Sequence, residues 1–325
     1  MNDIIKKISE ELSSDLENYE HFLKESLYSK VNLINVVVSY TMKHKGKRFR
    51  PLLCVLSSRL NNDIPNKSTF LSASTVEILH VATLLHDDVI DDASLRRGWP
   101  SIKKIWNNKI AILVGDYMFS KSLKNISELD NLESIKLLSS ISHRLSEGEI
   151  LQIEKAKNKN MTEEVYFKMI SDKTASLISG SCVLGYMSNN DDSRKKNISN
   201  FGEYLGIAYQ MKDDLFDIVG KLDETGKQSN LDLKKNMLTL PYIYAIDNSS
   251  FESRNDIISK IKFWYNRKDL REIKKIIVKS GGIEYTKQMI EDFSNKAISE
   301  LDVFEDSKYK DFLIDTVNFN MNRIK

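Results

Sequence analysis

The sequence predicts an all-α protein. Its 325 residues include only 4 Pro and 12 Gly, so residues that interrupt helices are scarce. Apolar residues recur at spacings of three and four through most of the chain, which is typical of amphipathic helices. No segment alternates apolar and polar residues convincingly, as a half-buried strand would. No Gly/Ser-rich linker divides the chain either, and we therefore expect one helical domain that covers residues 1–325.

The expected helices follow the periodic segments, and breaker residues separate several of them. Gly46 and Pro51 interrupt the pattern in KHKGKRFRP, and Gly98 and Pro100 stop any helix that continues past Arg97. The predicted helices cover residues 3–27, 32–43, 51–61, 68–91, 108–127, 131–156, 162–188, 195–219, 237–247, 252–265, 267–279, 282–300 and 307–322.

Composition restricts the classes of function. The net charge of +2 and the mixing of basic with acidic residues give no reason to expect nucleic acid or an anionic membrane as a partner. We expect no transmembrane segment and no secretory signal, because no apolar run has the required length or position. Cys54 and Cys182 lie in apolar contexts (LLCVLS and GSCVLG), which favours buried reduced thiols and a cytoplasmic location.

One acidic pattern, Asp-Asp-x-x-Asp, occurs twice, at residues 87–91 and 213–217, each time after an apolar run. On a helix, Asp87 and Asp91 share one face, and so do Asp213 and Asp217. Such pairs repel by roughly a few tenths of a kcal/mol. A single copy could be a solvated acidic helix end, but two copies among apolar neighbours favour bound cations. Carboxylate oxygens select Mg²⁺, which often also binds substrate phosphates.

Basic side chains that could bind phosphate occur near the first acidic pattern. Lys47 and Arg50 are at a helix start, where free N–H groups also favour an anion. Arg96 and Arg97 follow the acidic pattern, and guanidinium groups suit bidentate phosphate binding. His80 precedes Asp87 by seven residues and therefore projects from the same helix face. A lone His on an apolar helix is more often a core residue, but this alignment favours a functional role.

Lys173 and Thr174 interrupt another apolar segment, ISDKTASLI. They could present an ammonium group and a hydroxyl group to the interior of the bundle. The alternative for Lys173 is an apolar stem packed on the helix surface with its charged end in water.

Together these motifs resemble the trans-prenyl diphosphate synthases of the polyprenyl synthetase family. The resemblance implies an isoprenoid-synthase-type all-α bundle around a deep central cavity, usually as a homodimer. It covers about residues 40–300 and rests on the segments GKRFRP, VEILHVATLLHDDVID, RRG, GDYMFSKS, EGEILQ, DKTASLI, YQMKDDLFD, TLP and SGGIEY.

The resemblance also implies roles for individual residues. About three Mg²⁺ ions per active site would be bound by Asp87, Asp88, Asp91, Asp213, Asp214 and Asp217. The diphosphate of an allylic substrate would be held by Arg96, Lys173 and Gln210, and that of isopentenyl diphosphate by Lys47, Arg50, His80 and Arg97. The dipoles of Thr174 and Gln210 would face a carbocation. Asp92 extends the first pattern, but we do not expect it to be a primary ligand.

The implied reaction adds isopentenyl diphosphate units head-to-tail, in trans, to an allylic diphosphate of the farnesyl or geranyl type. In this family, bulky residues four or five positions before the first Asp limit product length. Here those positions hold the small residues Thr83 and Ala82. We therefore expect a medium- or long-chain product of the quinone side-chain type, as in octaprenyl or heptaprenyl synthases. A geranylgeranyl diphosphate synthase is the alternative.

The chain departs from the family pattern near its second acidic motif. The family usually has a Lys at the position of Met237, and Lys234 or Lys235 could replace its charge. Lys212, directly before Asp213, is unusual beside carboxylates and either points outward or pairs with them. Three rivals remain: a terpene cyclase, a non-catalytic regulatory subunit of a heteromeric synthase and a plain metal-binding bundle. Both acidic motifs and the basic set argue against them.

Overall fold

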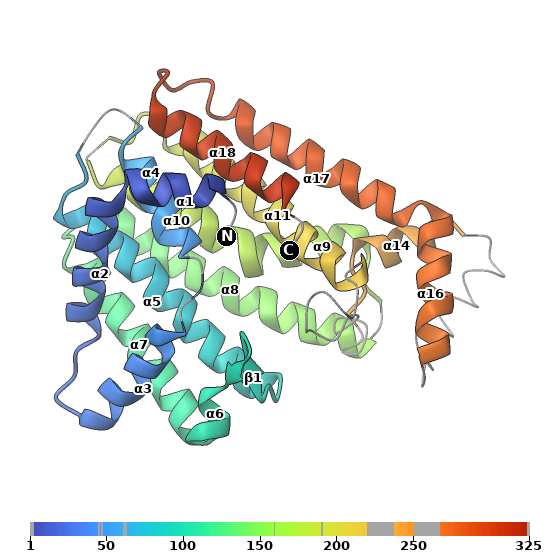
Figure 1. Cartoon of the computed structure of the whole chain (residues 1–325), viewed down its shortest axis with the longest axis horizontal. Coiled ribbons are helices and arrows are strands. Elements are labelled where there is room, and N and C mark those ends of the chain that lie inside the picture. The colour runs from blue at the N-terminus through green and yellow to red at the C-terminus, as the bar shows by residue number, and fades with distance from the viewer. Residues whose placement is uncertain are drawn as a thin grey trace. The chain divides into compact units, whose positions relative to one another are not determined.

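A computed structural model describes residues 3–44, 46, 48–60, 64–158, 160–189, 191–219, 237–249 and 267–323. The described chain is almost entirely helical, which confirms the predicted all-α class (Figure 1). Its longer helices are α1 (Asp3–Glu11), α2 (Ser13–Leu27), α3 (Asn32–Lys43), α4 (Phe49–Ser58), α5 (Lys67–Ile90), α7 (Asn108–Ser127), α8 (Leu132–Asn158), α9 (Glu163–Ile170), α10 (Ser176–Met187), α11 (Lys195–Val219), α14 (Leu240–Asp247), α16 (Arg267–Ser280), α17 (Gly282–Ser299) and α18 (Lys308–Asn322).

The structure differs from the expected helices at several points. The helix predicted over 3–27 is two helices, because Leu12 leaves the helical region with φ −102° and ψ 17°. The helix predicted over 162–188 contains a π-helical turn, η1 (Ser171–Ala175). A two-residue antiparallel pair, β1 (Leu95–Arg96) and β2 (Trp99–Pro100), and the short α6 (Ile102–Ile105) were not expected. The helix predicted over 252–265 lies outside the described residues.

The chain falls into two compact units, each assembled from segments that are distant in sequence. Unit 1 consists of Met1–Ile141, Leu177–Ser199 and Leu301–Ile314. Unit 2 consists of Ser142–Ser176, Asn200–Glu300 and Asp315–Lys325. The acidic pattern at residues 87–91 belongs to unit 1, and the pattern at 213–217 belongs to unit 2.

The core of unit 1 is built around α5, which packs along α7 and against α2 and α4. Asn66 caps its start by accepting hydrogen bonds from the backbone of Ser68 and Thr69, and the Thr69 hydroxyl completes a capping box. Among the described helices, α5 is the one long and apolar enough to cross a membrane, yet 78% of its most apolar window is buried inside the protein. It is therefore the core helix of this unit.

The two cysteines belong to unit 1 and are free and buried, as the sequence predicted. Burial raises the pKa of both thiols, that of Cys182 to about 12. Both side chains are therefore neutral at physiological pH, and they contribute to packing.

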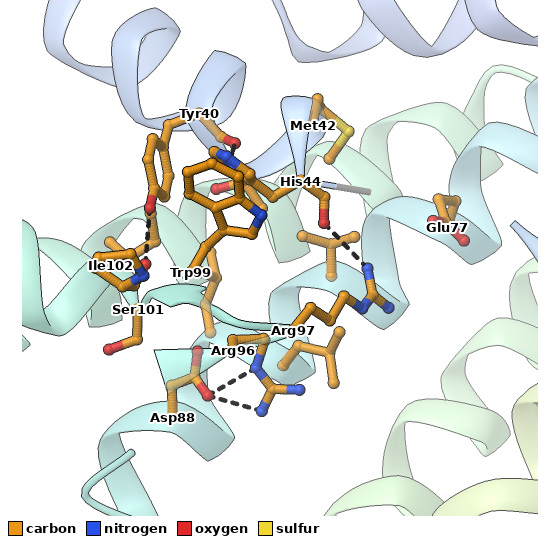
Figure 2. A pocket seen from close by; sticks show the side chains of 15 residues that line it. Tyr40, Met42, His44, Glu77, Asp88, Arg96, Arg97, Trp99, Ser101 and Ile102 are labelled. Carbon is orange, nitrogen blue, oxygen red and sulfur yellow. Dashed lines mark hydrogen bonds and ion pairs between the residues drawn. The ribbon is translucent and has the colours of Figure 1, made fainter. Parts of the chain in front are cut away.

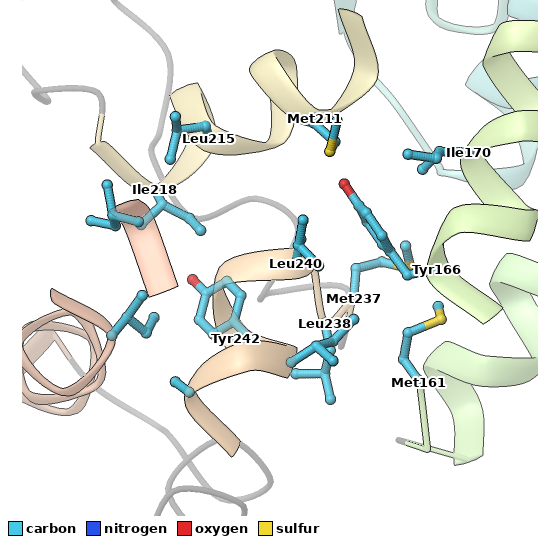
Figure 3. Close-up of a cluster of buried hydrophobic side chains, with 14 of the residues drawn as sticks. Met161, Tyr166, Ile170, Met211, Leu215, Ile218, Met237, Leu238, Leu240 and Tyr242 are labelled. Atoms are coloured by element: carbon cyan, nitrogen blue, oxygen red, sulfur yellow. The ribbon is translucent and has the colours of Figure 1, made fainter. Parts of the chain in front are cut away.

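The core of unit 2 joins α9, α14, α16 and α17. Its buried side chains include Tyr166, Met211, Leu215, Leu240 and Tyr242, which face one another in Figure 3. Met237, at the position where the family usually has a Lys, is buried in the same cluster. In this protein, the side chain at this position therefore packs in the apolar core. Lys234 and Lys235 lie outside the described residues.

Candidate active site

The first acidic pattern lies at the C-terminal end of α5. Asp87 and Asp88 are in the last turn, and Asp91 caps the helix, its N–H donating to the Asp87 carbonyl over 2.8 Å. No basic residue occupies this last turn. The C-terminal end of a helix is the negative end of its dipole, so carboxylates there are doubly unfavourable unless cations bind. Asp92, beyond the cap, is fully exposed and pairs with Lys103.

Asp88 is buried and paired with an arginine from the β1–β2 segment. Arg96 Nε and Nη2 each lie 2.7 Å from Asp88 Oδ1 (Figure 2). Burial raises the pKa of Asp88, while Arg96 opposes that shift. The predicted allylic-diphosphate residue Arg96 is thus held against a predicted metal ligand.

A pocket opens beside this pair, within unit 1. It is open to solvent, and its lining includes Asp88, Arg96, Arg97 and Glu77. Aromatic rings form another side of it: His44 and Trp99 have ring centroids 4.3 Å apart (Figure 2). The pocket therefore combines guanidinium groups with an aromatic wall.

Arg50 and His80, two residues predicted to bind isopentenyl diphosphate, are in contact. Arg50 Nη1 lies 3.3 Å from His80 Nε2, which accepts when the imidazole is neutral. Arg97 follows Arg96 and donates weakly to the His44 carbonyl over 3.4 Å. The structure therefore brings Arg50 and His80 together, whereas Lys47 lies outside the described residues.

We expect the pH dependence of stability to report on His80. Burial, then Arg50, Arg97 and Arg96, hold the pKa of His80 well below its usual value. The ordinary pKa of a histidine in the unfolded chain is about 6.5. At pH values between the lowered pKa and this one, the unfolded chain binds more protons than the folded protein, so the free energy of unfolding falls as pH falls. When the pH is lowered from about 7.5 to about 5.5, the free energy of unfolding of His80→Gln should therefore fall less than that of the unsubstituted protein. Urea unfolding at each pH measures this difference.

His21→Gln is the control, because His21 is exposed and pairs with Glu25 one turn along the same helix. It should keep the pH dependence of the unsubstituted protein. An unchanged pH dependence in His80→Gln would contradict the expected effect.

The predicted chain-length residues lie on α5. Ala82 is buried in a cluster that includes Leu85 and Met118. Thr83 is half-buried, and its hydroxyl donates to the His80 carbonyl over 2.8 Å. A larger side chain at Ala82 would therefore extend into the core between α5 and α7.

The second acidic pattern occupies the last turns of α11, so it is also at a C-terminal helix end. Asp213 pairs with Arg323, with Oδ1 2.6 Å from Nη2. Arg323 is buried and lies 4.0 Å from the ring centroid of Tyr209. Lys212 donates to the Met321 carbonyl over 2.8 Å. Its ammonium group is thus directed to the C-terminal segment, and this contact settles neither option that the sequence left open for it.

Asp214 ends a chain of hydrogen bonds inside unit 2. Its carboxylate accepts from Tyr166 Oη over 2.6 Å and from Gln210 Nε2 over 2.7 Å. Gln210 Oε1 in turn accepts from the Thr174 hydroxyl over 2.8 Å. The structure therefore brings together Thr174, Gln210 and Asp214, three residues that the sequence assigned to one site. Asp217, one turn further along α11, is half-buried.

Lys173 is held by α8. Its ammonium group pairs with Glu149 and donates to Gln152 Oε1 over 2.9 Å. Both partners belong to the EGEILQ segment. The Lys173 side chain is only partly exposed and its ammonium group is paired, which does not fit a charged end that is simply in water.

The donor chemistry of the two patterns fits Mg²⁺, because each assigned side chain is a carboxylate. Within the described part of the chain, no three His, Cys, Asp or Glu side chains are grouped closely enough to hold a metal ion. Two of these carboxylates form ion pairs with arginines: Asp88 with Arg96, and Asp213 with Arg323. Cation binding would therefore require these pairs to rearrange or to share their carboxylates.

Sequence reasoning missed residues that contact the predicted site. Glu77 is buried on α5 and lines the pocket; burial raises its pKa, which Arg50, Arg48 and Arg97 oppose. Its isolation within the apolar run STVEILH was an available signal. Tyr166 and Arg323 gave no such signal, because they reach Asp214 and Asp213 only through the tertiary fold.

Comparisons with known proteins identify the family of this chain. The Polyprenyl synthetase family model matches residues 31–279. The octaprenyl diphosphate synthase of Escherichia coli is 30% identical over 320 residues, which cover 98% of this chain and 99% of the relative. Heptaprenyl diphosphate synthase component 2 of Bacillus subtilis is 34% identical over 291 residues, or 89% and 82% of the two chains.

The fold has a solved counterpart. The crystal structure of a polyprenyl synthase from Caulobacter crescentus, complexed with calcium and isoprenyl diphosphate, superposes with a TM-score of 0.90. It is 28% identical, and the match covers 98% of each chain. The fold is therefore of the isoprenoid-synthase type, as the resemblance implied. The family model spans most of the chain, and the octaprenyl relative matches it over nearly its whole length. The chain therefore belongs to the polyprenyl synthetase family and is an enzyme that transfers prenyl groups.

Proposed function

We propose that this protein extends an allylic diphosphate with isopentenyl diphosphate, head-to-tail and in trans, to a medium- or long-chain polyprenyl diphosphate. The observation that carries the proposal is the retention of both acidic patterns with their basic neighbours in a chain that matches prenyl diphosphate synthases nearly end to end. A terpene cyclase does not need the residues assigned here to isopentenyl diphosphate.

The two substrates would be held by different groups. Arg96, Lys173 and Gln210 would bind the allylic diphosphate, since guanidinium and ammonium groups donate charge-assisted hydrogen bonds. Arg50, His80 and Arg97 would bind isopentenyl diphosphate, together with Lys47 outside the described residues. The Arg50–His80 contact suits this role, because a neutral imidazole donates from Nδ1 without adding charge.

The aspartates of both patterns would hold Mg²⁺, which when bound neutralises charge on the allylic diphosphate and favours its departure. Breaking the allylic C–O bond gives a carbocation and free diphosphate. The double bond of isopentenyl diphosphate attacks the cation, and the proton that is then lost passes to the released diphosphate. The Thr174 and Gln210 oxygens would direct their dipoles at the cation, and the apolar core would exclude water.

Product length would be set at Ala82. Ala82→Phe should shorten the product, because the added ring occupies the core region around Leu85 and Met118. Overpacking of this kind destabilises a core by roughly 1–3 kcal/mol. Chromatography of the dephosphorylated products measures the length.

Ala245→Phe is the matched control, because Ala245 is equally buried but belongs to the core of unit 2. It should lower yield without changing the longest product. Products of unchanged length from Ala82→Phe would show that the limit to growth lies elsewhere.

The proposed activity is tested with purified protein, Mg²⁺, labelled isopentenyl diphosphate and either geranyl or farnesyl diphosphate. We expect labelled prenyl diphosphates longer than geranylgeranyl diphosphate. Products that stop at twenty carbons would support a geranylgeranyl diphosphate synthase instead. No extension of either primer would contradict the catalytic proposal.

A partner subunit is the second candidate arrangement, because the Bacillus subtilis relative is described as component 2 of its synthase. A chain that needs a second component would be inactive alone and active after the component is added. Both acidic patterns are intact, so we expect this chain to be the catalytic one in either arrangement, and we favour activity as a homodimer. The homodimer and the cytoplasmic location remain predictions.

A further inference from the structure

The turn that carries Lys173 and Thr174 is a π-helix. Residues Ser171–Ala175 form η1 between α9 and α10. A π-helical turn is rare and is frequently found at functional sites. Such a turn persists when contacts from other elements hold it. The contacts that hold η1 therefore also determine where Lys173 and Thr174 project.

One arginine joins η1 to two other helices. Arg144, on α8, donates from Nε to Asp172 Oδ1 over 2.8 Å and from Nη2 to the Ser171 hydroxyl over 2.7 Å. Its Nη2 and Nη1 also donate to the two carboxylate oxygens of Glu203, on α11, over 2.8 and 3.3 Å. The planar fork of one guanidinium group thus joins α8, η1 and α11.

Other groups complete the network. The Ser171 hydroxyl also donates to Glu203, and Lys168 donates to Asp172 Oδ2 over 2.7 Å. Burial opposes the charge on both partners of the Arg144–Asp172 pair, but their hydrogen bonds prevail. The pKa of Asp172 is lowered and that of Arg144 is raised. Two cations therefore balance two carboxylates.

The backbone of α8 also lies against η1. A Cβ atom added to Gly148 would come within 2.7 Å of the Lys173 backbone nitrogen and 3.1 Å of Asp172 Cβ. Only a residue without a side chain allows this approach. Gly148 follows Arg144 by one helical turn, and Glu149 and Gln152, which hold the Lys173 ammonium group, come next. One face of α8 thus contacts both the backbone of η1 and its catalytic side chain.

We propose that Arg144 is a positioning residue: through Asp172, Ser171 and Glu203 it holds η1 in its π-helical form and so places Lys173 and Thr174 for the allylic substrate. This inference rests on the proposed function. Arg144 itself touches no substrate in this scheme. Its loss should therefore impair the steps that use Lys173 and Thr174, and leave the binding of isopentenyl diphosphate, which depends on Arg50 and Arg97, nearly unchanged.

A purely structural ion pair would behave differently. If Arg144 only stabilised the fold, its loss would lower the melting temperature and the amount of active enzyme, with both KM values unchanged. A misplaced Lys173 instead raises KM for the allylic diphosphate and lowers kcat. An error of about 1 Å in a catalytic position can reduce the rate on the order of 100-fold.

The test compares Arg144→Lys and Arg144→Gln with the unsubstituted protein at temperatures where each is folded by circular dichroism. Lysine keeps the charge but lacks the planar fork whose separate nitrogens contact Asp172, Ser171 and Glu203, so both variants should lose about 10- to 100-fold in kcat. Each should raise KM for the allylic diphosphate at least several-fold and change KM for isopentenyl diphosphate by less than about twofold. Glu203→Gln keeps the shape of the acceptor. It should show the same difference between the two KM values, but a smaller one.

His143→Gln is the matched control, because His143 is the preceding residue on α8 and is exposed, with Glu147 as its ion-pair partner. It should behave as the unsubstituted protein. Unchanged kcat and KM in folded Arg144 variants would overturn the proposal, and so would equal rises in both KM values. If the Arg144 variants do not fold, the two KM values of Glu203→Gln decide in the same way. An unsubstituted protein inactive with every primer would instead refute the proposed function, and this inference with it.

Discussion

Asp87→Asn should lower kcat/KM in Mg²⁺ by a factor of about 10²–10³. The substitution removes one negative charge from the group at the C-terminal end of α5 without changing the shape of the side chain. Cation affinity should fall, so activity should recover in part at high Mg²⁺. Removal of a carboxylate from the negative end of a helix also relieves repulsion, which opposes any loss of folding stability. Steady-state kinetics over a range of Mg²⁺ and thermal unfolding without Mg²⁺ measure the two effects.

Asp92→Asn is the control for this substitution. Asp92 is five residues further along, fully exposed and paired with Lys103. It carries the same charge but is not an assigned ligand, so its loss should leave the Mg²⁺ dependence unchanged. Equal losses in the two variants would mean that general negative potential, and not specific ligation, attracts the cation.

Arg96→Gln and Arg97→Gln should affect different substrates. Charge-assisted hydrogen bonds contribute about 1.5–3 kcal/mol, or about 10- to 150-fold in affinity. Arg96→Gln should raise KM for the allylic diphosphate by a factor in this range. Arg97→Gln should do the same for isopentenyl diphosphate. Initial rates measured with each substrate varied in turn, at saturation of the other, separate the two outcomes.

Stability supplies a second difference between these adjacent arginines. Arg96 is the cation on buried Asp88, and burial already raises the pKa of that carboxyl group. Arg96→Gln should therefore lower the free energy of unfolding by roughly 1–3 kcal/mol, less than for a fully buried pair because Arg96 is partly exposed. Arg97 is exposed and does not pair directly with Asp88, so Arg97→Gln should lower stability less than Arg96→Gln. If either substitution alone raised the KM values of both substrates, the assignment of the two arginines to different substrates would be wrong.

The sequence predicted most helices because their apolar residues repeat over several turns. The helix predicted over 108–127 is α7 at the same bounds. The failures were local. The break at Leu12 and the π turn at Ser171–Ala175 each change the path of the backbone over a few residues without changing the apolar pattern. Periodicity does not detect such changes, since η1 is held by Arg144 and Glu203 from other helices.

The candidate site was only partly accessible to sequence reasoning for a similar reason. The aspartates are recognisable by their spacing, and Thr174, Gln210 and Asp214 do meet in unit 2. The groups that hold them are not recognisable, because Arg323 follows Asp213 by 110 positions and reaches it through the path of α18. Lys212 shows the same limit: its partner is a backbone carbonyl, which no pattern of side chains reveals.

The two ends of α5 have opposite properties, and this has an evolutionary consequence. Its start has a complete capping box, while its end collects carboxylates and has no basic residue in the last turn. A lysine or arginine in that turn would strengthen the helix. The same residue would compete directly with a bound cation. Selection for activity therefore excludes the simplest stabilising substitutions here, and attempts to make this protein more heat-resistant should leave this end of α5 unchanged.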